Sequence, residues 1–169
     1  MNTIVKRLLD LHDTTFALAS RLQSPFLLLV RLYWGGYQLA YITGLGHLRH
    51  LDKVAEYFAS LNMPMPAQSA LIVSCVEFFG GILLALGLFS RFTSLVLTIN
   101  MLSAYIIGDR EAFLSFFSDP DKFSAAAPYV FLIASSIVLI FGPGKLSVDY
   151  LLRRFAHLPN AAGKDPYES

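Results

Sequence analysis

The chain has 169 residues, of which 55% are hydrophobic and only 15% are charged, and its net charge is +1. Soluble domains carry roughly 25% charged residues, so this composition disfavours a soluble domain and favours a polytopic membrane protein. A net charge near zero gives no reason to expect a nucleic-acid partner. Cys75 is the only cysteine, which excludes an internal disulfide and a thiol relay within the chain.

The first 24 residues are predicted to form an interfacial segment. Residues 4–22 mix apolar side chains with Lys6, Arg7, Asp10 and Arg21, and this pattern indicates an amphipathic helix lying in the cytoplasmic interface of the membrane. A disordered leader is the alternative. Because proline is tolerated in the first turn of a helix, a new helix is expected to begin at Ser24-Pro25.

Four predominantly apolar segments follow, and they predict a bundle of four transmembrane helices at about 25–45, 67–89, 92–108 and 125–141. Residues 47–61 predict a short amphipathic helix on the outer surface, and residues 109–123 an interfacial loop that carries a short aromatic helix. Ser147 is expected to cap a last amphipathic helix through His157. The predicted fold is therefore all-α, with a membrane domain over 25–152 and a basic cytoplasmic segment and tail over 153–169.

The placement of Lys and Arg predicts the orientation in the membrane, because cytoplasmic loops carry an excess of both. With both termini in the cytoplasm, eight basic residues lie on the inner side and four on the outer side. The four outer residues are Arg49, Lys53, Arg110 and Lys122. The short turn at Ser90-Arg91 and the basic C-terminal segment carry most weight in this prediction.

Polar side chains within the predicted spans are the candidate site residues. A carboxylate such as Glu77 costs roughly 2.5 to 3.5 kcal/mol at the centre of a span, so it must be paired, protonated or functional. Arg31, Gly35 and Gln38 are spaced to share one face of an α-helix. A direct Arg31–Glu77 salt bridge is one arrangement, and Asn100, at intermediate depth, could bridge the two.

Two interpretations of this polar seam stay open. Arg31, Gln38, Glu77 and Asn100 form either a ligand-binding site, with Glu77 as the candidate catalytic residue, or a structural network that fixes the register of the helices. The aromatic residues near Trp34 could sandwich a quinone or serve as ordinary packing. His47 and His50 are interpreted as surface histidines, and no metal site is predicted. Close helix packing is predicted at four glycines, namely Gly35, Gly36, Gly80 and Gly81.

Three runs of sequence resemble the DoxX family of bacterial membrane proteins, over roughly residues 25–152. They are Leu27-Leu-Leu-Val-Arg-Leu-Tyr-Trp-Gly35, the run from Glu77-Phe-Phe-Gly-Gly to Ser90-Arg91, and Phe141-Gly-Pro-Gly-Lys-Leu-Ser-Val-Asp149. The family often carries His-Gly after the glycines of the first span, where this chain reads Tyr41-Ile-Thr-Gly-Leu-Gly-His47. The resemblance implies a four-helix protein of the bacterial inner membrane, similar to the small subunit of thiosulfate:quinone oxidoreductase.

Some relatives are linked to membrane oxidoreductase complexes that act in thiol and oxidative-stress balance, so the expected role is a membrane subunit of a redox system. Such a subunit would present a quinone or lipid site to a redox partner protein. The chain shows no flavin, nicotinamide or iron–sulfur motif and is not expected to be a complete enzyme alone. The alternatives are a non-redox scaffold, a small-molecule carrier that uses Glu77, and a lipid-modifying enzyme with Glu77 as acid or base. The lipid bilayer is the expected environment, and a homo-oligomer is a further candidate assembly.

Overall fold

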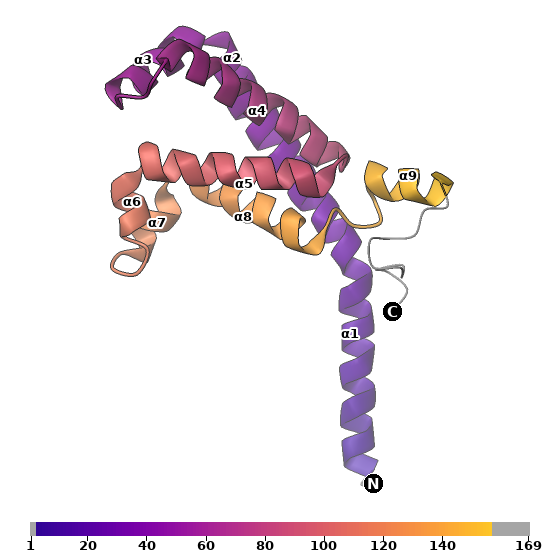
Figure 1. The fold of residues 1–169 in the computed structure, drawn as a ribbon. Helices are drawn as coiled ribbons and strands as arrows, with labels where there is room; N and C mark the ends of the chain where they lie inside the picture. The colour runs from indigo at the N-terminus through magenta and orange to yellow at the C-terminus, as the bar shows by residue number, and fades with distance from the viewer. Residues whose placement is uncertain (1–2, 157–169) are drawn as a thin grey trace.

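The computed structural model describes residues 3–156, and every regular element in that range is a helix. The all-α prediction is therefore confirmed. Two antiparallel helix pairs form the body of the molecule (Figure 1). In one pair η1 (Arg31–Gly44) packs on α4 (Pro66–Leu86), and in the other α5 (Ser90–Ile107) packs on α8 (Pro128–Phe141).

Short helices close one end of both pairs, which we call the loop end. There α2 (Leu45–Arg49) and α3 (Leu51–Ser60) join η1 to α4, and α6 (Arg110–Leu114) and α7 (Pro120–Ala125) join α5 to α8. The single helix expected over 47–61 is thus broken, because His50 leaves the helical conformation at φ −132° and ψ 45°. At the opposite, terminal end lie the α4–α5 turn and residues 142–147, followed by α9 (Val148–Ala156) (Figure 1).

The expected helix start at Ser24-Pro25 was wrong, because α1 runs without interruption from Thr3 to Val30. Pro25 lies inside this 28-residue helix, where it lacks the N–H that would bond to the carbonyl of residue 21 and its ring crowds that carbonyl. The remaining bonds on either side preserve the helix. In Figure 1, α1 continues directly into η1 and extends away from the bundle at the terminal end.

The first predicted span is a π-helix over most of its length. In η1 each backbone N–H bonds to the carbonyl five residues earlier, as from Leu45 to Ala40, whereas an α-helix uses a spacing of four. Each residue therefore turns the helix by a smaller angle. Arg31 and Gln38, seven residues apart, would share a face of an α-helix, but they do not share one here.

Helix length and hydropathy support a membrane location for α4 and α5. Both are long and apolar enough to cross a membrane, with mean hydropathies of 2.1 and 1.2. The apolar α8 has only 14 residues, about 21 Å of helix against an apolar core of about 30 Å. The count of four spans therefore stays a prediction. The observed turn between α4 and α5 lies at 87–89, before the Ser90-Arg91 position that the sequence predicted.

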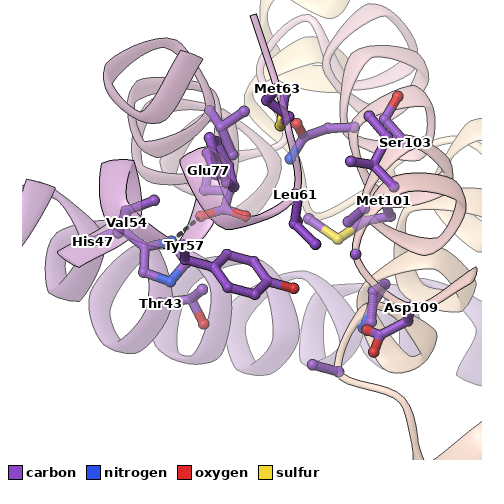
Figure 2. A pocket seen from close by; sticks show the side chains of 18 of the residues that line it. Thr43, His47, Val54, Tyr57, Leu61, Met63, Glu77, Met101, Ser103 and Asp109 are labelled. Carbon is purple, nitrogen blue, oxygen red and sulfur yellow. Dashed lines mark hydrogen bonds and ion pairs between the residues drawn. The ribbon is translucent and has the colours of Figure 1, made fainter. Parts of the chain in front are cut away.

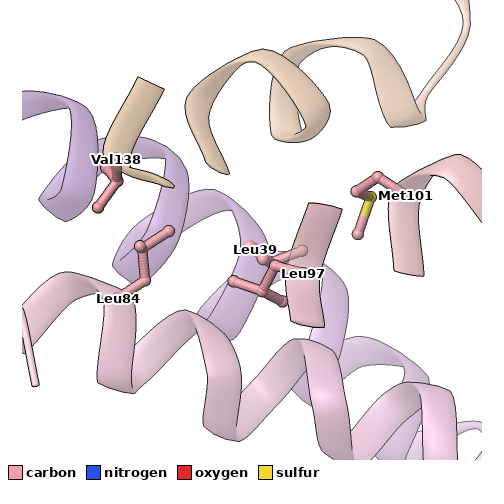
Figure 3. Close-up of a cluster of buried hydrophobic side chains, with 5 residues drawn as sticks. All are labelled: Leu39, Leu84, Leu97, Met101 and Val138. Atoms are coloured by element: carbon pink, nitrogen blue, oxygen red, sulfur yellow. The ribbon is translucent and has the colours of Figure 1, made fainter. Parts of the chain in front are cut away.

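Neighbouring helices approach each other closely at two glycines of α4, both within its own pair and toward the other pair. A Cβ atom added to Gly81 would lie 2.6 Å from the Gly35 carbonyl oxygen, and one added to Gly80 would lie 2.9 Å from Leu97. The first contact joins η1 to α4, and the second joins α4 to α5. Around them a buried apolar core links all four helices (Figure 3), formed by Leu39, Leu84, Leu97, Met101 and Val138.

Arg31 holds the terminal end together. Its side chain is fully buried, and its guanidinium donates hydrogen bonds to the Ala85 carbonyl, 3.3 Å away, and to the Leu146 carbonyl. Ala85 lies in the last turn of α4, where a cation also interacts favourably with the helix dipole. Arg31 therefore connects the start of η1, the end of α4 and the segment that precedes α9.

Asp149 reinforces the same region from α9. Its two carboxylate oxygens accept hydrogen bonds from the backbone N–H groups of Phe89 and Ser90, each at 2.8 Å. These groups begin α5, so the carboxylate satisfies donors that have no partner within that helix. The predicted cap at Ser147 is confirmed, since its hydroxyl accepts from the Tyr150 N–H at 3.2 Å. His157 and the tail lie outside the described residues.

We predict that Gly87→Ala destabilises the protein. Backbone strain accounts for roughly 1–3 kcal/mol of the lost stability, and steric clashes of the added Cβ add to it. Gly87 has φ +68°, and an added Cβ would lie 2.0 Å from Arg31 Nη1 and 2.6 Å from Ser147 Cβ. Thermal unfolding in mild detergent, followed by circular dichroism, measures the effect. Gly46→Ala is the matched control, because an added Cβ there meets nothing within 4 Å and alanine favours the helix. Equal melting temperatures for Gly87→Ala and the wild type would contradict this account.

Candidate functional site

A cavity of about 640 Å³ lies between the two helix pairs at the loop end. The connecting helix α3, the helices α4 and α5, and the start of α8 all contribute to its wall. Figure 2 shows polar and apolar side chains around this space. Its apolar wall includes Val54, Leu61, Met63, Met101 and Phe131. Met101 also belongs to the buried core, so the core borders the cavity.

His47 and Glu77 form an ion pair in the wall of this cavity. The His47 Nδ1 and Glu77 Oε2 atoms lie 2.7 Å apart (Figure 2). Gly44 positions them, because a Cβ at this residue would lie 2.5 Å from the Phe78 backbone nitrogen. With no side chain at Gly44, the end of η1 meets the backbone of α4 directly beside Glu77. His47, three residues further along the chain, then reaches the carboxylate.

The pair has one buried partner and one half-exposed partner. The Glu77 side chain is 8% exposed and that of His47 is 40% exposed. The hydrogen bond to Glu77 raises the pKa of His47 above its ordinary value of 6.5, burial lowers this pKa, and the charge of Glu77 raises it again, with a net increase. The pair therefore favours the imidazolium form of His47 more than an isolated histidine side chain would.

Asn100 brings an unpartnered hydrogen-bond donor to the same cavity. Its Nδ2 atom is buried and has no hydrogen-bond partner among the residues that the structure describes. Leu97, one turn away on α5, packs on Gly80 of α4, and the next turn of each helix carries Asn100 and Glu77 respectively. A buried donor without an acceptor costs about 1–3 kcal/mol. An acceptor on a bound molecule would remove that cost.

The structure divides the predicted polar seam into separate parts. Glu77 and Asn100 line one cavity, but Arg31 bonds to backbone carbonyls at the terminal end. The direct Arg31–Glu77 salt bridge, one of the arrangements that the sequence left open, is not formed, because Arg31 bonds at the terminal end and Glu77 pairs with His47. Gln38 is outside the cavity wall, and its amide nitrogen donates to the Tyr33 hydroxyl at 3.2 Å. The π-helical turn of η1 accounts for its rotation away from Arg31.

His47 is the site residue that the sequence interpretation missed, since it was taken for a surface histidine. Two local signals could have identified it: the preceding Gly44, which permits close approach of a helix, and the position that the DoxX family often fills with His-Gly. Other titratable groups also line the cavity, and these are His50, Lys53, Tyr57 and Asp109. Tyr57 approaches the end of α5, where its hydroxyl would lie 2.9 Å from a Cβ added to Gly108.

We predict that His47 titrates above pH 6.5 and that Glu77→Gln moves this pKa to or below 6.5. A raised pKa in the folded state means that the pair contributes its full stability below pH 6.5 and loses it as pH rises through the folded-state pKa. Nuclear magnetic resonance of ¹⁵N-labelled imidazoles in detergent measures the titration, with His50→Gln to assign the signals. The same His47 pKa in wild type and Glu77→Gln would show that the carboxylate does not hold the imidazolium.

Comparison with known proteins identifies the family of this chain. No curated protein and no solved structure matches the chain. The DoxX family profile matches residues 26–110, which is half of the chain. The matched part includes Arg31, the His47–Glu77 pair and Asn100. The chain therefore belongs to the DoxX family and is a membrane protein.

Proposed function

We propose that this protein is a multi-pass subunit of the bacterial inner membrane that holds a quinone in the loop-end cavity for a redox partner protein. The observation that carries the proposal is the buried Asn100 amide nitrogen, which lines the cavity and has no acceptor among the described residues. A ligand that supplies a carbonyl oxygen would complete its hydrogen bonding.

A quinone suits the chemistry of the wall. Its ring is flat and apolar, and its two carbonyl oxygens accept hydrogen bonds on opposite sides. Asn100 supplies a donor for one of these oxygens, Glu77 lies in the same wall, and the remaining wall is mostly apolar. Ligand cavities of about 300–1,000 Å³ bind molecules of this size, and the cavity here has about 640 Å³.

Electrons would have to reach the quinone from another protein. The chain has a single cysteine and carries no flavin, nicotinamide or iron–sulfur motif. The quinone supplies the redox chemistry when bound, and the residues of this chain bind the ring, orient it and exclude lipid from it. The protein would then act as the membrane subunit of an oxidoreductase.

We predict that Asn100→Leu weakens binding of a short-chain ubiquinone by roughly tenfold, the equivalent of one hydrogen bond. Leucine keeps a similar volume and removes the unpartnered donor, so stability should not fall. Isothermal titration calorimetry on the purified protein measures the affinity, and mass spectrometry identifies any quinone that copurifies. Gln38→Leu is the matched control, because this amide lies outside the cavity wall.

The outcomes of this experiment separate the classes of function. Weaker binding in Asn100→Leu, with wild-type binding in Gln38→Leu, supports the quinone site. A protein that binds no quinone and copurifies with none would overturn it and favour a non-redox scaffold or a carrier that uses Glu77. Equal binding in all three proteins would place the quinone outside this cavity.

The orientation that we propose places both termini in the cytoplasm and the loop end outside. Arg91, Lys145, Arg153 and Arg154 all lie at the terminal end, as the positive-inside rule requires. In a Cys75→Ser background, we predict that Phe117→Cys at the loop end reacts with a membrane-impermeant maleimide on intact cells. Arg154→Cys in α9 should react only after the cells are broken. The reverse pattern would invert the topology.

A further inference from the structure

The two members of the His47–Glu77 pair differ in their exposure to solvent. Glu77, on α4, faces the cavity and is almost inaccessible, whereas the His47 side chain on α2 is 40% exposed. Their 2.7 Å contact joins the carboxylate oxygen to one ring nitrogen, which leaves the second ring nitrogen of the half-exposed imidazole for other partners. Stability alone requires only that the carboxylate be paired, and a fully buried partner would achieve that.

We propose that Glu77 and His47 form a proton relay between the occupant of the cavity and the water at the loop end. This inference rests on the proposed function for the identity of the occupant, a quinol or quinone. In one direction, the His47 imidazolium first releases its Nε2 proton to the water at the loop end, and tautomer exchange then moves the remaining ring proton from Nδ1 to Nε2. Glu77 accepts the proton of the quinol O–H group, whose electrons leave to the redox partner protein, and passes that proton to the free Nδ1, which restores the imidazolium. In the other direction the same steps run in reverse.

The other titratable groups of the wall do not form an equivalent path. His50, Lys53 and Tyr57 face the cavity from the α2–α3 side, and Asp109 faces it from the segment after α5. Among the described residues, none of these four has a hydrogen bond to either member of the pair. The two members of the pair are therefore the only titratable groups in this wall that a hydrogen bond connects. In this proposal, protons of the cavity occupant exchange with water on the loop-end side of the molecule.

A pH jump followed by infrared spectroscopy tests the relay without any ligand. The carboxyl band of Glu77 is assigned by its absence from Glu77→Gln. His47→Gln keeps a side-chain donor for the carboxylate but cannot transfer a proton, so we expect the band to follow the jump on the order of a hundredfold more slowly than in the wild type. His50→Gln, a neighbouring histidine in the same wall, should respond at the wild-type rate.

A second measurement separates failure of the relay from failure of the quinone site. Calorimetry of ubiquinol binding in two buffers of different ionisation enthalpy counts the protons exchanged, and His47→Gln should lower that count while binding persists. A slowed band in His47→Gln supports the relay even if no quinone binds, in which case only the proposed occupant is wrong. An unslowed band, or a Glu77 carboxyl that does not respond to pH, overturns the relay even if quinone binds.

Discussion

The buried guanidinium of Arg31 is the constraint on which the bundle depends. Burying a cation is costly unless hydrogen bonds replace its lost water, and here Nη1 and Nη2 donate to the carbonyls of Ala85 and Leu146. Meeting that need fixes the end of α4 and the segment before α9 against the start of η1. The three sequence runs that resemble the DoxX family supply Arg31, Gly87 and Leu146 respectively. Because these three residues lie together at the terminal end, three runs that are far apart in the sequence resemble the family together.

This arrangement determines what remains at the loop end. Because Arg31 bonds to carbonyls at the terminal end, it does not reach Glu77, and the Glu77 carboxylate pairs instead with His47 on α2. The two helix pairs are tied together at one end and diverge toward the other (Figure 1). The cavity lies where they diverge, so Arg31 and the His47–Glu77 pair lie in two separate places, one at each end of the same four helices.

The sequence predicted those features that depend on local pattern. Composition and apolar length predicted the all-α class and the α4 and α5 helices, and Ser147 predicted its own cap. The prediction of a shared face for Arg31 and Gln38 was wrong because the count assumed 3.6 residues per turn, and no local signal in η1 indicated i→i+5 bonding. The His47–Glu77 pair joins residues 30 apart in the sequence. It depends on the approach of two backbones at Gly44, which spacing alone does not reveal.

The two polar systems differ in what an apolar replacement would do. At the terminal end, removal of Arg31 would leave the carbonyls of Ala85 and Leu146 without this donor, so the charge is part of the packing. At the loop end, an apolar residue at position 100 would remove an unsatisfied donor at no cost in hydrogen bonds. Burial of the Glu77 carboxylate is also costly, and apolar side chains that replace a buried ion pair often preserve or raise stability, although in this pair only Glu77 is buried and His47 is 40% exposed. Packing therefore accounts for Arg31 but not for Asn100 or Glu77, and this difference favours a binding role for the loop-end residues.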